Sequence, residues 1–316
     1  MSSQGFPLLR PHELPALKPQ QQWLIEELWG YQAVGIIGGE PKSYKSFLAL
    51  EIGIAVATGA MCLGRYPVKT RGPVLLYAAE DALHIVRERL NSMCMSRGLE
   101  LHNLDLWVIT VPVMRLDQER DQRHLVHTIE KVKPALLILD PFVRLHRIDE
   151  NVSADVAPLL AFLRQQQRQQ GCSVILVHHA RKGGGAMRGG QALRGSSEFH
   201  AWGDSNIYLR HAPKGLRMAI EHRAAPSQKD IPIELHTENG TALLIGKAPE
   251  EPPHQSAPES SPRERVLAQL HEAAGPMKTH PLRKLCRMKS ATLTKTLTEL
   301  DASGIVTHTE DGWMIL

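Results

Sequence analysis

The sequence predicts an α/β protein with a mostly parallel sheet covered by helices on both faces, followed by a small winged helix-turn-helix domain. Two observations support this prediction. Between residue 34 and about residue 210, short apolar runs rich in branched side chains alternate with longer helical stretches, which is typical of a parallel sheet buried on both faces. Beyond a Pro/Ser/Glu-rich stretch, residues 262–316 show three helical patterns and then two short strands.

Six apolar runs predict the strands of the sheet, and they span residues 33–37, 73–79, 106–110, 135–140, 173–179 and 205–210. Helical patterns lie between most of them, at residues 45–58, 82–97, 119–132 and 153–170. Because parallel strands need long crossover connections, this alternation predicts parallel pairing. Three later runs have no helix between them, at residues 216–223, 231–235 and 241–246. They predict antiparallel strands added to one edge of the sheet.

Composition indicates the domain boundaries. Residues 1–22 are rich in Pro and Gln and predict an extended N-terminal arm, so the sheet domain is expected to span residues 23–246. Residues 247–261 are rich in Pro, Ser and Glu and have no apolar period, which indicates a linker. Residues 262–316 begin with Pro at a helix start and end with two strands around an Asp-Gly turn, as expected for a winged helix-turn-helix.

Composition also limits the class of protein. With 316 residues, 42% of them apolar, and a net charge of +4, the chain can bury a core and is only mildly basic. Its four cysteines form no C-x-x-C pair, which argues against a disulfide scaffold and against a zinc site. No apolar run approaches the ~18 residues of a membrane span, and the N-terminus lacks a signal pattern. We therefore expect a cytoplasmic protein.

A phosphate-binding loop is the most informative motif. In "GGEPKSYKS", residues 38–46, Gly39, Lys45 and Ser46 match the pattern G-x-x-x-x-G-K-[ST], and Tyr44 stands where the second glycine belongs. An apolar strand precedes the loop and an apolar helix follows it, as this motif requires. The motif predicts binding of ATP and Mg²⁺, with the Ser46 hydroxyl on the metal. The expected nucleotide-binding residues are Gly39, Glu40, Pro41, Lys42, Ser43, Tyr44, Lys45, Ser46 and Phe47.

Tyr44 is the departure from this motif. A side chain at a position with positive φ costs about 1–2 kcal/mol, whereas a position with negative φ does not require glycine. Because the rest of the motif is present, we expect a negative φ at Tyr44. Replacing Tyr44 by glycine should then keep nucleotide binding.

Charged side chains at the ends of other predicted strands add to this site. Asp140 ends the fourth strand, at the edge where ligands of open α/β sheets bind, and would hold Mg²⁺ directly or through water. Glu80 follows the second strand and could activate the water that attacks the γ-phosphate, while Asp81 is expected to cap the next helix. His178 and His179 end the fifth strand, and one of them could contact the γ-phosphate.

Five motifs occur in order along the chain: "GEPKSYKS", "LLYAAED", "LLILDPFVRLH", "VHHARKGG" and "ALRGSSE". As a set they resemble the RecA-like ATPases, and most closely the AAA_25 branch, which includes hexameric replicative helicases of the RepA type. The resemblance covers roughly residues 20–245. The roles that it implies are Lys45 and Ser46 on phosphate and Mg²⁺, Glu80 as catalytic base, Asp140 on the metal shell and His179 as γ-phosphate sensor.

The resemblance also implies a ring, usually of six subunits, with ATP bound at the subunit interfaces. An arginine of the neighbouring subunit would complete each site. Arg223 matches the late strand that carries this residue in the family, and Arg194 is the other candidate.

Two basic loops are candidates for contact with DNA, expected to be single-stranded in the channel of a ring. The Gly-rich loop 180–195 holds four basic residues and no acid, so it could lie along a phosphate backbone. An ordinary surface loop is the alternative, because it has no aromatic side chain for base stacking. The second loop, 144–151, follows Asp140. The candidate contacts are Arg144, Arg147, Arg181, Lys182 and Arg188.

The C-terminal domain offers a second candidate for DNA contact. Residues 273–298 carry six basic side chains and no acid, and the last helix of a helix-turn-helix enters the major groove. Lys289 and Lys295 are the expected contacts. The alternative is a winged helix that binds a protein.

Three functions remain open from the sequence. The first is an ATP-driven DNA helicase or translocase that acts in replication of a plasmid or other mobile element, with a possible replication or mobile-element protein as partner. The second is an ATP-dependent recombination or remodelling factor. The third is an ATP-switched regulator that binds DNA or protein through the winged helix. Strand displacement distinguishes the first function, and DNA-stimulated hydrolysis distinguishes the first two from the third.

Overall fold

The computed structural model describes residues 6, 8–14, 22–179, 198–213, 215–237, 239–246, 261–273, 275–286 and 288–316. The chain forms two compact units, Met1–Ala248 and Pro249–Leu316. The first contains the sheet, and the second contains the C-terminal helices. Among the described residues, no helix is both long and apolar enough to cross a membrane.

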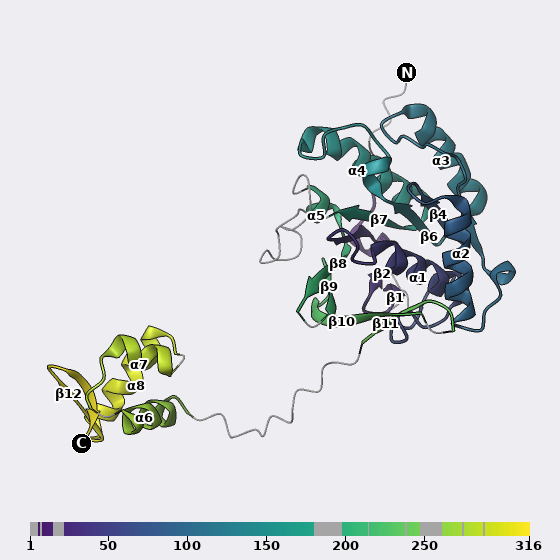
Figure 1. Ribbon diagram of the computed structural model, residues 1–316. Coiled ribbons are helices and arrows are strands. Elements are labelled where there is room, and N and C mark those ends of the chain that lie inside the picture. Colours follow the sequence, from purple (N-terminus) through teal and green to yellow (C-terminus); the bar gives the residue numbers. More distant parts are fainter. Residues whose placement is uncertain are drawn as a thin grey trace. The chain divides into compact units, whose positions relative to one another are not determined.

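A nine-stranded sheet forms the centre of the first unit, in the order β11-β10-β9-β8-β3-β7-β6-β4-β5 (Figure 1). The strands from β8 to β5 pair in parallel, and β9, β10 and β11 add antiparallel pairs beyond β8. Their bounds are β3 Val34–Gly39, β4 Val74–Ala78, β5 Leu106–Val108, β6 Leu136–Asp140, β7 Ser173–His179, β8 Ser205–Ala212, β9 Gly215–His222, β10 Gln228–His236 and β11 Ala242–Ile245. The predicted parallel sheet and its antiparallel edge are confirmed.

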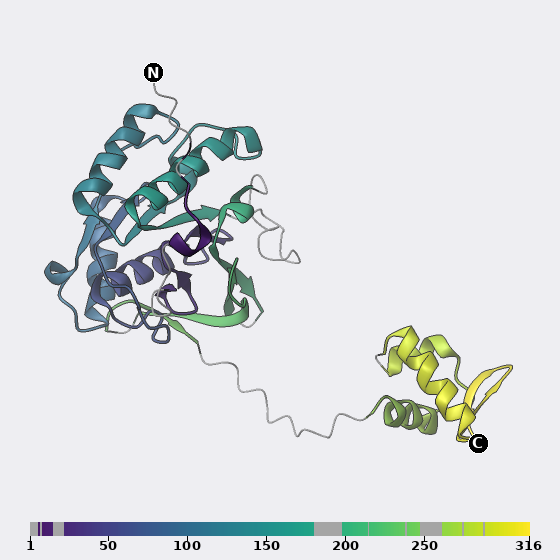
Figure 2. The same ribbon diagram turned by 180° about the vertical axis from the view of Figure 1, so that it is seen from behind.

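Helices cover both faces of this sheet, as predicted. One face carries α1 Lys45–Thr58 and α2 Leu83–Met95. The other face carries α3 Glu119–Val132, α4 Ser153–Gln170 and the short α5 Glu198–Trp202, and Figure 2 shows the same two layers from behind. Single turns of 3-10 helix lie at η1 Pro11–Glu13, η3 Leu101–Asn103 and η4 Phe142–Arg144.

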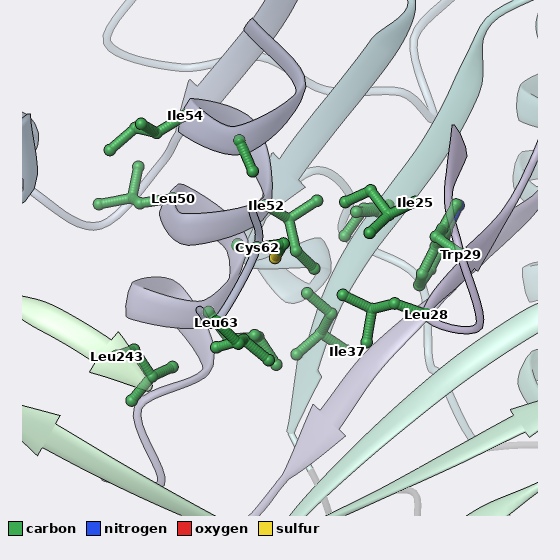
Figure 3. Close-up of a cluster of buried hydrophobic side chains, with 14 of the residues drawn as sticks. Ile25, Leu28, Trp29, Ile37, Leu50, Ile52, Ile54, Cys62, Leu63 and Leu243 are labelled. Atoms are coloured by element: carbon green, nitrogen blue, oxygen red, sulfur yellow. The ribbon is translucent and has the colours of Figure 1, made fainter. Parts of the chain in front are cut away.

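Successive side chains of each parallel strand point to opposite faces, so the core divides into two clusters. Along β7, Ile175 and Val177 pack in the cluster that includes α1, and Val174 and Leu176 pack in the cluster that includes α4. Figure 3 shows part of the α1 cluster, where Ile52 of α1 and Ile37 of β3 are among the buried side chains. This alternation, which we call strand parity, also decides which face of the sheet each residue at a strand end lies on.

A short hairpin ahead of the sheet was not predicted. It consists of β1 Trp23–Ile25 and β2 Trp29–Gly30, which pair antiparallel. Trp29 is fully buried in the α1 cluster. Gly35 lets this hairpin and β8 approach β3, because a Cβ there would lie 1.6 Å from the Ser205 carbonyl oxygen and 3.0 Å from the Trp29 ring. Strands of two or three residues are too short to show a period in the sequence.

The second unit has three helices and a hairpin: α6 Pro262–Glu272, α7 Thr279–Leu285, α8 Ser290–Ala302, β12 Val306–Thr309 and β13 Gly312–Ile315. Ser261 and Glu264 form a reciprocal capping box at the start of α6. Leu293, Leu297 and Leu300 place one face of α8 in a small apolar core. A bridge from Met277 to Trp313 adds a further pairing beside the hairpin.

Candidate nucleotide site

Four parallel strands of the sheet end around one pocket. Gly39 of β3 lies beside His179 of β7, and Ala78 of β4 lies beside Asp140 of β6. We call the hollow at this edge the carboxyl-edge pocket, and its volume is about 300 Å³. Its lining consists of Lys42, Ser43, Tyr44, Lys45, Ser46, Phe47, Glu80, Asp81, Arg89, Asp140, Pro141, Val177 and His179. The predicted loop, acids and histidine therefore meet at one place.

Strand parity explains why these side chains converge. Asp140 follows Leu136 and Ile138, and His179 follows Ile175 and Val177, all of which face α1. Glu80 stands two residues beyond Ala78, which packs against the same cluster. The phosphate loop leads into α1 on that face as well, so a period of two brings the charged groups to the loop.

Lys45 occupies the first position of α1 and is only 5% exposed. Its ammonium donates to the Glu40 carbonyl oxygen at 2.7 Å. Burial lowers the pKa of Lys45, and the nearby Asp140 and Glu80 carboxyls oppose that shift. A buried ammonium at a helix N-terminus attracts anions, because the helix dipole and the free N–H groups act in the same direction.

The loop before Lys45 is tight, and Gly39 is required there. A Cβ on Gly39 would lie 2.5 Å from the Leu209 carbonyl oxygen and 2.8 Å from the Ser43 hydroxyl. The Ser43 hydroxyl in turn donates to the Glu40 carbonyl at 2.8 Å. The glycine of the motif is thus explained by packing.

The expectation of a negative φ at Tyr44 is wrong. Tyr44 has φ 61° and ψ 26°, the left-handed conformation that glycine adopts most easily. Tyr44 is 39% exposed, and its ring makes an edge-on contact with Phe47, with ring centroids 6.1 Å apart. The loop therefore keeps the glycine-type backbone with a tyrosine in place, at a cost of about 1–2 kcal/mol.

Asp140 is 9% exposed and accepts a hydrogen bond from Ser46. Burial raises the pKa of Asp140 to about 6, while the Ser46 hydrogen bond and Lys45 act in the opposite direction. Asp81 and Glu80 add negative charge nearby and raise the pKa further. Magnesium prefers oxygen ligands, usually one or two carboxylates or hydroxyls beside the phosphates. The Ser46 and Asp140 oxygens fit that preference.

The two histidines of β7 separate to opposite faces. His179 lines the carboxyl-edge pocket. His178 is buried on the α4 face, where it packs on Phe199 with centroids 4.4 Å apart and lies 3.5 Å from a carboxylate oxygen of Glu150. Of the two alternatives left open by the residues alone, only His179 reaches the pocket.

Comparison with known proteins identifies the family. The profile of the AAA_25 family, described as an AAA domain, matches residues 3–185, which is more than half of the 316 residues. This chain belongs to the AAA_25 family. The predicted resemblance to the AAA_25 branch is thereby confirmed.

One solved structure shares the fold of this AAA_25 chain at low sequence identity, and two others are similar to it below a TM-score of 0.5. A solved ATPase domain matches with a TM-score of 0.54 and 14% identity, over 68% of this chain and 85% of that one. A KaiC-like protein from the hyperthermophilic archaeon Pyrococcus horikoshii matches with a TM-score of 0.48 and 16% identity, over 71% and 93%. The RadB recombinase matches with a TM-score of 0.48 and 18% identity, over 69% and 94%.

Three contacts around the AAA_25 pocket were not found from the sequence. Glu80 accepts a hydrogen bond from Arg144 Nε at 2.9 Å, so a candidate catalytic base is paired with a candidate DNA contact. Asp81 does not cap α2, contrary to the expectation: Ala82 is the N-cap, without a side-chain bond. Asp81 instead pairs with Arg89 of α2. The Arg89 guanidinium also lies over the Phe47 ring, 5.2 Å from its centroid.

Arg223 lies at the opposite edge of the sheet. It follows β9, and the neighbouring residue His222 pairs with Ser205 at the start of β8. Asp204, just before β8, accepts a hydrogen bond from the backbone of Val34 and pairs with Arg223 at 3.2 Å. Arg223 is therefore separated from the phosphate loop of its own chain by the length of β3.

The other predicted residues have different surroundings. Arg147 is exposed between η4 and α4. Lys289 and Lys295 are exposed at the start of α8 and within it. The remaining candidates, Arg181, Lys182, Arg188 and Arg194, lie outside the described residues. Glu40, Pro41 and Gly39 belong to the phosphate loop but do not line the pocket.

Proposed function

We propose that this chain is a Mg²⁺-dependent ATPase that forms a ring, usually of six subunits, and moves along or unwinds DNA. The observation that supports it best is the carboxyl-edge pocket, where Lys45, Ser46, Glu80, Asp140 and His179 arrive from neighbouring parallel strands and one helix. A recombination or remodelling factor, and an ATP-switched regulator, are the alternatives that the experiment below separates.

In this proposal each side chain has one task. Lys45 contacts the terminal phosphates, and the Ser46 hydroxyl with Asp140 holds the metal. Bound Mg²⁺ would neutralise charge on the phosphate oxygens. Glu80 orients and deprotonates the attacking water, and its carboxylate is suited to this because it lines the pocket without being deeply buried. His179 donates a hydrogen bond to the γ-phosphate.

Arg223 supports the ring in this proposal. Its position at the far edge of the sheet suits an arginine that reaches into the pocket of a neighbouring subunit, where such a cation stabilises the charge of the transition state. Its side chain is 56% exposed, which leaves it accessible to a neighbour. Arg194 stays the other candidate for this role.

DNA contact in this proposal comes from the loops that follow β6 and β7. Arg144 and Arg147 belong to the first loop, and Arg181, Lys182 and Arg188 belong to the second. A backbone-tracking cation interacts with every nucleotide alike, which suits a motor that must not stop at particular sequences. Fluorescence anisotropy with oligo(dT) at several salt concentrations would measure the number of these contacts.

The test is ATP hydrolysis with and without single-stranded DNA, followed by strand displacement on a forked duplex. The motor proposal predicts DNA-stimulated hydrolysis and displacement that requires ATP. Stimulation without displacement would favour the recombination or remodelling factor. An ATP hydrolysis rate that is the same with and without DNA would favour the regulator. The Lys69→Ala variant is a matched control, because Lys69 is an exposed lysine paired with Glu26 outside the pocket.

A second proposal concerns the C-terminal unit, which we infer to be a winged helix-turn-helix that binds DNA. The supporting observation is that Lys278, Lys284, Lys289 and Lys295 are all exposed within a stretch without acids. Lys289→Ala with Lys295→Ala should weaken binding to duplex DNA and lower its salt dependence. The control variant is Lys229→Ala, because Lys229 is an exposed lysine on β10 of the first unit. Unchanged DNA affinity in the double variant would point to a protein partner.

A further inference from the structure

A second hollow lies beside the carboxyl-edge pocket and shares Glu80 with it. We call it the arginine hollow. It has a volume of about 310 Å³ and lies among the ends of β4 and β6 and the loop after β5. Its lining includes Tyr77, Glu80, Pro112, Val113, Arg115 and Arg144. The ATPase chemistry proposed above gives this hollow no role.

The positive charges of this hollow exceed its negative charges. Arg144 pairs with Glu80, whereas Arg115 pairs with no carboxylate among the residues that the structure describes. The Arg115 guanidinium donates from Nη1 to the carbonyl oxygens of Arg144 and His146, the second at 3.5 Å. Its Nε is cut off from solvent without an acceptor among those residues. One cation in the hollow thus lacks a counter-charge.

A neutral donor stands beside the two arginines. The Tyr77 hydroxyl accepts the N–H of Met114 at 3.0 Å, which leaves its own proton for another acceptor. Burial raises the pKa of Tyr77, so the hydroxyl keeps that proton at neutral pH. Two guanidinium groups and a hydroxyl are donors suited to a tetrahedral oxyanion, and arginine is the side chain that matches phosphate best.

We propose that the arginine hollow binds a phosphate group, and that its binding draws Arg144 away from Glu80. This inference rests on the proposed function for the role of Glu80 as base. Two sources can supply the group: a phosphodiester of bound single-stranded DNA, or orthophosphate that leaves the neighbouring nucleotide pocket. In both cases the hollow connects events outside the nucleotide pocket with the state of the carboxylate that activates water.

The pair that must break is weak. The Arg144 side chain is 60% exposed and that of Glu80 is 44% exposed, and ion pairs exposed to this degree contribute little to stability. A phosphate group already held by Arg115 would compete for Arg144 with a stronger, bidentate interaction. Glu80 would then lose the hydrogen bond from Arg144, which leaves its carboxylate oxygen free to accept a hydrogen bond from the attacking water.

The first arm of the test measures hydrolysis without DNA and with oligo(dT) in wild type, Arg144→Gln, Arg115→Lys and Arg123→Ala. Arg123 is the control, an exposed arginine of α3 paired with Glu119. We expect Arg144→Gln to raise the DNA-free rate several-fold, because Glu80 is released permanently. We expect its stimulation by DNA to fall towards one-fold. Arg115→Lys keeps the charge and the fold, and should lose part of the stimulation.

The second arm uses orthophosphate as the probe. The protein is loaded with Mg²⁺, ADP and beryllium fluoride so that the nucleotide pocket is filled, and the ³¹P line width of added orthophosphate is measured. Broadening that is present in wild type and Arg123→Ala but absent in Arg115→Ala and Arg144→Gln assigns the hollow to orthophosphate. If the Arg115 and Arg144 variants lose DNA stimulation but still broaden the orthophosphate line, the hollow is assigned to the phosphodiester.

Two results would overturn the inference. One is a set of Arg115 and Arg144 variants that match Arg123→Ala in both arms. The other is a DNA-free rate in Arg144→Gln at or below that of wild type. Failure of the proposed function is recognised separately, because wild type itself would then hydrolyse no ATP, and the line-width comparison would still judge whether the hollow binds phosphate.

Discussion

The amino and carboxyl edges of the parallel sheet both carry charged residues, but these charges are compensated within the chain to different degrees. At the amino edge, Asp204 is satisfied by the chain itself, since it pairs with Arg164 and Arg223 and accepts the Val34 N–H. At the carboxyl edge, Asp140 is buried with its pKa raised, and the pKa of Lys45 is lowered by burial. Charges that the protein buries without full compensation mark a place where a ligand completes them.

The largest expected effect is on Lys45. Lys45→Ala should reduce ATP hydrolysis by about 10³-fold, because the cation that we propose to contact the terminal phosphates is lost. The melting temperature should stay equal or rise, because the buried ammonium is desolvated in the native state. A steady-state phosphate-release assay beside a thermal melt checks both, with Lys69→Ala as the control. Residual hydrolysis within ten-fold of wild type would contradict the assignment.

Arg223 should give the next largest effect and sharpen the contrast between the edges. Arg223→Ala should keep nucleotide binding and lower hydrolysis by about 10³-fold, because arginine fingers act on the transition state. Arg210→Ala, an exposed arginine paired with Asp230 in the same antiparallel part of the sheet, is the control.

Mixing tests whether Arg223 acts on a neighbour. Equal amounts of Arg223→Ala and Lys45→Ala subunits should recover part of the activity, because some interfaces then combine an intact Lys45 with an intact Arg223. No recovery in mixtures that assemble normally would remove Arg223 from this role and leave Arg194 as the candidate.

Replacing the two aspartates by asparagine should change the free energy of unfolding in opposite directions. Asp204→Asn should lower the free energy of unfolding by about 1–3 kcal/mol, because two arginines lose their counter-charge. Asp140→Asn should raise it at pH 7 by about 1–3 kcal/mol, because the folded pKa of about 6 lies above the ordinary value of 3.8. Urea unfolding of both variants at pH 7 measures the difference.

The pH dependence of Asp140 follows from the direction of that shift. A raised pKa means that the native state binds the proton more tightly, so the carboxylate costs stability above pH 6 and ceases to do so as the pH falls towards 3.8. The gain in free energy of unfolding of Asp140→Asn over wild type should therefore shrink as the pH falls from about 6 towards 3.8. An advantage that is constant over this range would show that Asp140 is not destabilised by burial.

Tyr44 should give the smallest effect. Tyr44→Gly removes about 1–2 kcal/mol of backbone strain but adds freedom to the unfolded chain and loses the contact with Phe47. We expect the free energy of unfolding to change by less than about 1 kcal/mol and the ATP affinity by less than about three-fold. Isothermal titration calorimetry checks the affinity. A ten-fold loss would mean that the ring contacts nucleotide.

Much of the fold could be predicted because the informative patterns are local. The apolar runs of β3, β6 and β7 are long and flanked by helical periods, so their positions follow from the sequence. The β1–β2 hairpin escaped prediction because its strands have three and two residues. Its packing also depends on the close approach of Trp29 and Ser205 to Gly35, and a local pattern does not reveal a contact with a residue as distant in the sequence as Ser205.

The site was predictable where strand parity decides and unpredictable where loops meet. Parity alone separates His179 from His178, and the same rule brings Asp140 to the phosphate loop. The φ of Tyr44 depends on the whole loop, so the residue type alone led to the wrong expectation. The Glu80–Arg144 pair joins positions 64 residues apart on two flexible side chains, and no spacing rule encodes such a contact.

The most direct test is a crystal structure with Mg²⁺ and a non-hydrolysable ATP analogue. We expect a triphosphate along residues 39–46, with Lys45 Nζ on the terminal phosphates and the metal beside Ser46 and Asp140. A carboxyl-edge pocket that stays empty at saturating analogue, or a nucleotide bound elsewhere on the chain, would contradict the proposed site.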